Sequence, residues 1–396
     1  MTKKLSIGKA ATLASIIMAA PGVMAQMAQT VDTNQEGLHF QGRLGIEHDS
    51  NVLRVGSGAQ SDTAYTAGVG LTYNKQFSLQ RIRANIQADA WRYSDNSQLN
   101  FNTINYALAW DWSVTPRFHG TVSADRKQFR EVTTDPVSFA NRIGRRTERT
   151  ELAEGAFDIA GPWSVLAGVS HYRTESTEPF SWDASPDITY WHGGVGYKAA
   201  SGSEFALRYK RGKGEYKDAS FATLNSEFDE NQVEATARWS ITGKTTIDAR
   251  IAHVKRDHDS APVLDFSGMV GGVSATWDIT GKTSLVAGYQ HDLSATGLIT
   301  GGKVESDRFF LSPVWHITAK TSANLRYDHT QRKWKDTGVP VFVGRSEKID
   351  AIQAGVDWEA LRTITVSGYI RQEKLRSSVN AGYKANVYGV AARANF

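Results

Sequence analysis

Charged and apolar residues alternate one for one along many segments of this chain. In one such segment Phe205, Leu207 and Tyr209 fall on one face of an extended strand, and Arg208 and Lys210 fall on the other. An unpaired charge is costly in a soluble core, whereas the water-filled lumen of a transmembrane barrel solvates it. The alternation therefore predicts strands with one face toward lipid and one toward an aqueous lumen. The same pattern covers the segments 232–239, 323–328 and 352–358.

A turn signature recurs about every forty residues and is the main internal repeat. An aromatic residue ends one strand, a tight polar turn follows, and a second strand with a period of two begins. Eight such turns, with the segments before the first and after the last, predict eighteen strands. The clear copies are 112–117, 239–244, 277–282, 315–320 and 358–362, and weaker copies begin at Tyr73, Phe157 and Tyr197.

The expected strands have about ten or more residues, which matches a tilted crossing of a bilayer. A soluble β-propeller also repeats at about forty residues, but each blade needs four short strands, and each repeat here holds two long ones. We predict an all-β transmembrane barrel, antiparallel and up-and-down, with short periplasmic turns and longer extracellular loops. The expected spans are 38–47, 63–74, 80–93, 101–113, 117–130, 147–159, 163–174, 188–198, 203–212, 228–240, 244–256, 266–278, 282–293, 305–316, 320–332, 347–359, 362–373 and 384–396.

The C-terminal strand is apolar on one face and ends in an aromatic residue. Tyr388, Val390, Ala392, Ala394 and Phe396 form the apolar row. This ending resembles the assembly signature of bacterial outer-membrane barrels, which implies the barrel-assembly machinery as a partner. In a soluble sandwich the same strand would leave a long unpaired apolar edge.

Tryptophans at the strand ends have a physical role in this arrangement. An indole ring is apolar and its N–H seeks a partner, so we expect these rings at the periplasmic lipid interface, beside the short turns. The tryptophans are Trp112, Trp239, Trp277, Trp315 and Trp358. The opposite connections, 48–62, 131–146, 174–187, 213–227 and 333–346, are longer and more polar, and we expect them to be extracellular.

The N-terminus carries an export signal. Lysines precede an apolar run over 10–20, and small residues then lead to Ala25, so residues 1–25 are predicted to be a secretory signal peptide. The apolar run is too short to span a bilayer. We expect 26–37 to be a short periplasmic segment and 38–396 to be the barrel.

The net charge excludes one class of partner. The whole chain has 45 basic and 41 acidic residues, but the predicted signal holds three lysines and no acid, which leaves 42 against 41. This balance gives no reason to expect a nucleic-acid partner. The chain has no cysteine, so disulfides and thiol chemistry are excluded.

The lumen wall is the main candidate site. Guanidinium groups bind carboxylate or phosphate, and acids accept hydrogen bonds from sugar hydroxyls, so a charged wall offers a hydrated path. The same charges can instead pair across strands and brace the barrel, and both roles can coexist. The inward cations are Arg81, Arg83, Arg208, Lys210, Arg238, Arg250, Arg308, Arg326, Arg371 and Arg393, and the inward acids are Asp89, Asp111, Asp125, Glu234, Asp248, Asp328 and Asp357.

One long connection and its continuation could fold inward as a constriction, because they carry several arginines beside an acid. An ordinary solvated loop explains the same composition. The residues concerned are Asp135, Arg142, Arg145, Arg146 and Arg149.

No pattern for catalysis or metal binding stands out. The ten histidines lack metal-ligand spacing, and there is no Gly-x-Ser-x-Gly elbow. Gly281-Lys282-Thr283 lacks the upstream glycine of a phosphate-binding loop and is read as a turn. Asp49, Ser50 and Asn51 could offer oxygens to calcium, but a turn stabilised by Asp and Asn is favoured. We predict no cofactor, no metal and no enzyme activity.

A succession of motifs resembles one family. The segment 47–54 pairs an aspartate and an asparagine with an aliphatic pair and arginine, and further matches follow in order: 78–81, Tyr93 with 99–101, 110–112 with 117–120, and 265–268. Together they are similar to the EpsL-like outer-membrane barrels of exosortase-linked exopolysaccharide biosynthesis clusters, related to a β-barrel porin group. His48 and Leu79 depart from the family pattern.

The resemblance implies a role in exopolysaccharide production or export, and the residues alone imply a channel. We expect a passive polar conduit in the bacterial outer membrane, with outer-membrane lipid, a polysaccharide or oligosaccharide and periplasmic export components as partners. A general diffusion porin for sugars or small anions is the alternative. An outer-membrane enzyme acting on glycan or lipid is a third reading, and it would need a Ser–His–acid or paired-carboxylate cluster at one rim.

Overall fold

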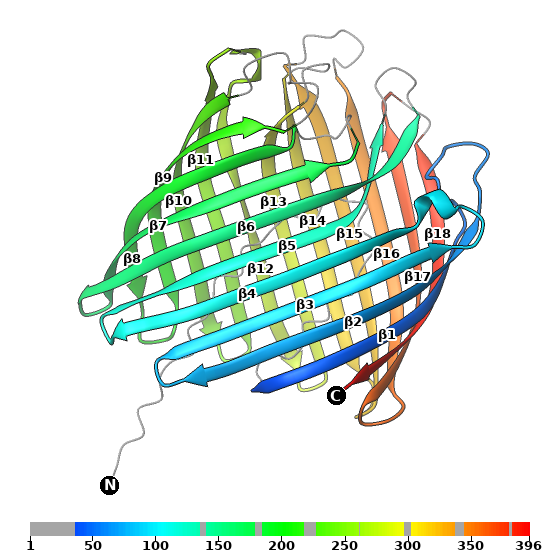
Figure 1. Cartoon of the computed structure of the whole chain (residues 1–396), viewed down its shortest axis with the longest axis horizontal. Coiled ribbons are helices and arrows are strands. Elements are labelled where there is room, and N and C mark those ends of the chain that lie inside the picture. Colours follow the sequence, from blue (N-terminus) through cyan, green and yellow to red (C-terminus); the bar gives the residue numbers. More distant parts are fainter. Residues whose placement is uncertain are drawn as a thin grey trace.

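Eighteen antiparallel strands form one closed sheet in the computed structural model (Figure 1). The structure describes residues 36–134, 140–178, 184–217, 227–260, 262–296, 302–336, 344–379 and 382–396. The strand number and the up-and-down order confirm the prediction from the sequence. The predicted signal peptide and almost all of the predicted segment 26–37 lie outside the described residues.

Each strand pairs with its neighbours in the chain. Two short 3-10 helices, η1 (Ser97–Leu99) and η3 (Pro262–Leu264), lie in connections. Within the described ranges, no helix has the length and apolarity needed to cross a membrane. The strands are β1 (Gly37–Asp49), β2 (Asp62–Phe77), β3 (Gln80–Tyr93), β4 (Phe101–Thr115), β5 (Phe118–Thr134), β6 (Asn141–Ala160), β7 (Trp163–Ser176), β8 (Pro186–Lys198), β9 (Glu204–Tyr216), β10 (Glu227–Thr242), β11 (Thr245–His258), β12 (Phe266–Thr280), β13 (Thr283–Ala295), β14 (Lys303–His316), β15 (Thr321–Lys335), β16 (Ser346–Glu359), β17 (Ile364–Ser377) and β18 (Tyr383–Asn395).

The first and last strands close the barrel. β1 runs antiparallel to β18 from Gln41 opposite Asn395 to Asp49 opposite Val387. Beyond this ladder, the backbone N–H of Phe396 donates to the carbonyl of Phe40 at 2.8 Å, and the return hydrogen bond is 2.9 Å long. The C-terminal aromatic residue therefore takes part in the seam, and no strand edge is left open.

The repeated turns share one local hydrogen bond. The backbone N–H of Lys244 donates to the hydroxyl of Thr242 at 3.1 Å, and Lys282 with Thr280 repeats this geometry at the same distance. A third copy joins Lys320 to Thr318. Threonine side chains that accept from a backbone two residues ahead stabilise tight turns. This bond gives the sequence repeat a physical reason.

The extracellular ends of two strands are longer than predicted. The predicted bounds of the connection 131–146 are wrong, because β5 continues to Thr134 and β6 begins at Asn141. Arg142, Arg145 and Arg146 therefore lie on β6 rather than in a loop, while Asp135 falls outside the described residues. In this region charged residues occupy positions that are apolar in the other strands. The alternating pattern is therefore missing, and the sequence did not predict these strand ends.

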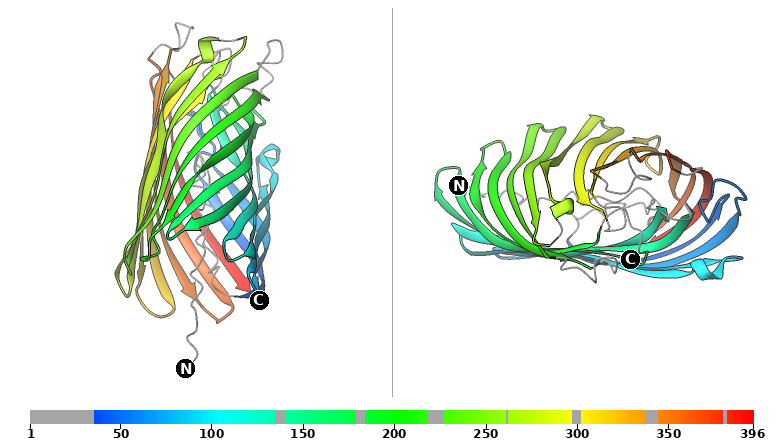
Figure 2. Two further views of the ribbon diagram at one scale, coloured as in Figure 1. Left: turned by 90° about the vertical axis from the view of Figure 1, so that its left-hand side faces the viewer. Right: turned by 90° about the horizontal axis from the view of Figure 1, so that it is seen from above.

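The outer face is apolar. Leu44, Val69 and Ile370 are 67%, 65% and 57% exposed, and similar side chains alternate with buried or polar residues on every side of the barrel. A continuous apolar band on a closed sheet is stable in hydrocarbon, because no backbone group is left unpaired there. In cross-section the barrel is an elongated ring, longer in one direction than in the other (Figure 2).

Candidate functional site

Ion networks cover the inner wall, and in several of them one acid serves two cations. Glu234 is the clearest case, because Oε1 lies 2.9 Å from Lys210 Nζ and Oε2 lies 2.6 Å from Arg250 Nε. Its side chain is only 4% exposed. The same arrangement recurs where Asp328 lies between Arg308 and Arg326. Glu154 contacts Arg208 and the imidazole ring of His192.

The other predicted lumen residues form simpler pairs. Arg83 lies 2.7 Å from Asp111, and Arg238 lies 3.8 Å from Asp248. Arg81 donates to the side-chain oxygen of Asn74 at 3.0 Å. The sharing of acids between cations could not be read from the sequence, because it depends on strand register and on reach across several strands. Asp89 pairs with Arg43, Asp357 accepts from Asn324 and Ser367, and Asp125 interacts with Lys127 and Thr150.

Arg371 differs from these paired cations. It lies on β17 between the lipid-facing Ile370 and Gln372, and is 6% exposed. Its Nε and Nη2 atoms have no hydrogen-bond partner among the described residues. The next acid on the same face, Glu373, is engaged by Arg54 and by the hydroxyl of Tyr383. Arg371 thus holds two buried donors without a partner among the described residues, and Arg393, another predicted lumen cation, likewise has an Nε without a partner.

The opposite walls of the barrel meet near the extracellular end. Arg146 on β6 lies 3.7 Å from Glu131 on β5, and Arg332 on β15 lies 3.8 Å from Glu347 on β16. Arg332 also interacts electrostatically with Glu131 and Arg146, although nine strand pairings separate β6 from β15 either way round the ring. Val132 packs against an apolar cluster on β16–β18. We call Glu131, Arg146, Arg332 and Glu347 the cross-lumen brace.

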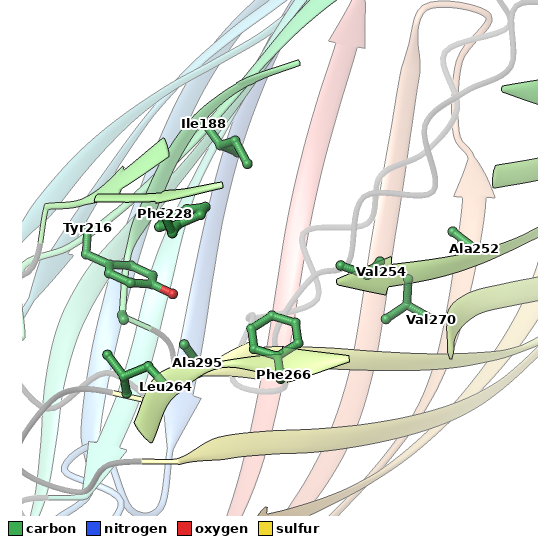
Figure 3. Packing of buried hydrophobic residues seen from close by; sticks show 10 residues of the cluster. Ile188, Tyr216, Phe228, Ala252, Val254, Leu264, Phe266, Val270 and Ala295 are labelled. Carbon is green, nitrogen blue, oxygen red and sulfur yellow. The ribbon is translucent and has the colours of Figure 1, made fainter. Parts of the chain in front are cut away.

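A second region of the lumen is filled by apolar and aromatic side chains. Figure 3 shows Ile188, Phe228 and Phe266 of this cluster, which comes from β8 to β13 and the adjoining connections. Arg256 lies among them, with its guanidinium carbon 4.1 Å from the ring centre of Phe228. Its Nη2 atom lies 2.5 Å from Oε2 of Glu230. The extracellular half of the barrel is therefore packed in part like a protein interior, and the passage there is narrower than the strand number suggests.

The turn after β1 is held by its own side chains. Asp49 accepts from Arg54 at 2.7 Å and from the backbone of Asn51 at 2.9 Å. Burial opposes the charge of Arg54, but Glu373 and Asp49 hold its pKa above the ordinary value. The oxygens of Asp49 are engaged within the protein, which supports the structural role predicted for this motif.

The five tryptophans predicted for the membrane interface lie at strand ends beside the short turns, and their place at the interface stays a prediction. Trp239, Trp315 and Trp358 are about half exposed on the outer face, at the ends beside the short turns. Trp277 is 46% exposed, and Trp112 contacts Phe118 edge-on at 5.0 Å. The sequence reading missed the opposite aromatic belt, which the exposed Tyr and Trp residues on alternate strand positions could have revealed. That belt includes Tyr65, Trp191, Tyr209, Tyr289 and Tyr388.

Two observations bear on the alternative of an outer-membrane enzyme. Across the described ranges, no group of three or more His, Cys, Asp or Glu side chains could hold a metal ion. A Ser–His contact does occur on the outer face, where Ser267 Oγ lies 3.2 Å from His253 Nε2. No carboxylate pairs with His253 in the part of the chain that the structure describes, so this contact lacks the acid of a triad.

Comparisons with known proteins found similar solved structures. No family model and no curated protein matches the sequence. The chain is similar to OccK1 (OpdK) of Pseudomonas aeruginosa, with 10% identity, a TM-score of 0.48, and coverage of 91% of this chain and 99% of that one. It is also similar to OccK2 (OpdF) of the same organism, solved in complex with glucuronate, at 10% identity, a TM-score of 0.49, and 91% and 97% coverage.

The fold and the two faces of the wall define the class of this protein. A closed, even-numbered antiparallel sheet with an apolar exterior, aromatic belts and a charged interior is a transmembrane β-barrel. Such barrels reside in the bacterial outer membrane, and this chain is an outer-membrane β-barrel of eighteen strands. The resemblance to EpsL-like barrels is not matched by any family model and stays a prediction.

Proposed function

We propose that the barrel is a passive diffusion channel for small polar solutes, with a preference for anions. The observation that carries this proposal is Arg371, a buried cation on the inner wall whose Nε and Nη2 have no partner among the described residues. Both atoms are covered in the structure, so a carboxylate or phosphate accepts from them only after the guanidinium group turns toward the lumen.

The neighbouring charges support the same preference. Arg308 and Arg326 share the single carboxylate of Asp328, and Arg326 lies in register with Gln353, which is in turn in register with Arg371. This stretch of wall therefore carries more positive than negative charge. A wall of one sign raises the local concentration of solutes of the opposite sign.

Export of an exopolysaccharide is the competing proposal, and it rests on the resemblance alone. The cross-lumen brace and the apolar cluster narrow the extracellular half of the barrel, which favours small solutes over a hydrated polymer. Deleting the gene in its native host and measuring polymer outside the cell and in the periplasm separates the two. Periplasmic accumulation with loss of surface polymer would replace the porin proposal.

Zero-current potentials test the anion preference directly. The purified barrel in a planar bilayer under a KCl gradient should give the sign of an anion-selective channel. Arg371→Gln should lower the anion-to-cation permeability ratio about twofold to fivefold, since one charge near the path contributes about 0.5–1 kcal/mol in a watery lumen. Arg211→Gln, on the exposed outer face of β9, is the matched control and should leave the ratio unchanged. Cation selectivity, or equal effects of both variants, would refute the proposal.

A further inference from the structure

The outer face of β16, β17 and β18 carries a cluster of exposed cations at the extracellular end. Lys348, Lys374, Arg376 and Lys384 are all exposed and alternate with buried inward residues. We call these four residues the basic patch. The acid within it is Asp350, so positive charge is in excess on this part of the surface.

Strand register places like charges opposite each other in the patch. Lys348 is the cross-strand partner of Arg376, and Lys374 is the partner of Lys384. Directly opposed like charges destabilise a sheet, because their Cβ atoms lie only about 5 Å apart. An anion held between them removes this repulsion.

The local acid leaves most of the patch uncompensated. Asp350 lies 2.8 Å from Arg376 and 2.7 Å from His329, so it is engaged at both oxygens. Lys374 and Lys384 form no ion pair with any residue that the structure describes. Lys374 lies in register with Asp350 on one side and with Lys384 on the other, but Asp350 pairs with Arg376 and His329.

The patch lies beyond exposed apolar residues of the same three strands, toward the extracellular end. Ile352, Ile370 and Tyr388 are 47%, 57% and 53% exposed, and each lies four residues before or after the lysine of its own strand, on the membrane side. At a strand tilt of about 40°, four residues rise roughly 10 Å. Lysine stems bend back toward the interface, which brings their ammonium groups to the headgroups.

Lysines at two other places on the outer rim are paired with acids. On β11, Lys255 lies 2.8 Å from Asp257, and beside the patch Lys335 lies 3.9 Å from Glu305. On β5 to β7, Arg126, Arg149 and Arg173 are also opposed in register, but Arg149 and Arg173 pair with Glu175.

We propose that the basic patch binds the phosphate groups of an anionic glycolipid in the outer leaflet. Position decides in favour of a lipid, because the lysines lie just above the lipid-facing row of the same three strands. Phosphate oxygens accept from ammonium and guanidinium groups together, which matches the mixed Lys and Arg composition of the patch. The inference rests on the membrane location and is independent of the solute that the lumen carries.

Titration of the detergent-solubilised full-length barrel with bisphosphorylated lipid A tests the proposal. The double variant Lys374→Gln/Lys384→Gln should bind at least tenfold more weakly, because each neutralised charge near a headgroup is expected to weaken binding about fivefold. The control Lys213→Gln/Lys255→Gln removes two exposed lysines from β9 and β11 and should bind like the wild type. Lys374→Arg/Lys384→Arg keeps the charge and should keep the affinity. Heat-modifiable mobility on gels confirms that each variant is folded.

Three further arms identify the source of the phosphate. Phosphate-free lipid A should bind the wild type weakly, and inorganic phosphate should compete only at millimolar concentrations or above. An anionic polysaccharide without a lipid anchor should not compete. Equal binding by the Gln double variant and the wild type, or tighter binding of the free phosphate or the polysaccharide than of the lipid, would overturn the proposal.

Discussion

Replacing Glu234 with glutamine tests whether the ion networks of the inner wall stabilise the barrel. They do so only if water in the lumen does not screen their charges. The change keeps the shape of the side chain and removes its charge. It separates the carboxylate from Lys210 at 2.9 Å and from Arg250 at 2.6 Å, at a site where the glutamate side chain is 4% exposed.

The size of the effect follows from these distances. At an effective dielectric constant of about 20, each contact has a Coulomb energy of about 6 kcal/mol, most of which offsets desolvation of the charges. Removing one partner of a buried pair leaves the cations uncompensated and typically costs about 3–5 kcal/mol. We therefore expect Glu234→Gln to lower the free energy of unfolding by about 3–5 kcal/mol.

Guanidinium unfolding in lipid vesicles, followed by tryptophan fluorescence, measures this loss. The control is Glu305→Gln, whose carboxylate lies 3.9 Å from Lys335 with side chains 30% and 49% exposed, and which should lose less than about 1 kcal/mol. A loss below about 1 kcal/mol for Glu234→Gln, or equal losses for the two variants, would show that water screens the wall and would refute the reasoning.

Three other changes probe the brace, the seam and a turn. Arg146→Met should destabilise the barrel by about 3–5 kcal/mol and raise its single-channel conductance, because buried carboxylates lose their cation and the walls separate; unchanged conductance in planar bilayers would contradict this. Deleting Phe396 removes both backbone hydrogen bonds to Phe40 and should reduce the heat-modifiable folded fraction in outer membranes, whereas full yield would argue against a role in the seam. Gly302→Ala should lower the free energy of unfolding by about 1–3 kcal/mol in denaturant titrations, because φ is +76° and a Cβ would lie 2.2 Å from the carbonyl oxygen of Lys335. Its control, Gly243→Ala, has open space around the new Cβ and should leave the free energy of unfolding unchanged.

Local pattern was sufficient to predict the number of strands and their two faces, but not the extracellular ends of β5 and β6. Alternation fixes the face of each residue once a strand is recognised, so Arg208 and Lys210 could be assigned to the lumen before any pairing was known. The C-terminal row ending at Phe396 similarly predicted an outer-membrane barrel, and in the structure the first strand pairs with the last. These features depend on neighbours within a few residues.

Contacts between distant strands could not be predicted in this way. Glu154 on β6 forms an ion pair with Arg208 on β9. Arg146 on β6 interacts electrostatically with Arg332 on β15, across the lumen. Such contacts depend on register, on reach across several strands and on the flattened cross-section, none of which alternation encodes. The basic patch was missed for the same reason, since Lys374 and Lys384 become neighbours only through pairing of β17 with β18.

The cross-lumen brace also has a consequence for the order of folding. β5 and β6 belong to the first half of the chain and β15 and β16 to the last quarter, so the brace requires both halves of the sheet to be in place. Contacts between residues so distant in sequence form late, because hairpins between neighbouring strands must form first. These hairpins lower the entropy cost of bringing the distant residues together. A partly inserted sheet therefore lacks the stabilisation that the brace provides. The brace forms only when β1 pairs with β18 and the barrel closes, so closure is the most cooperative step of assembly.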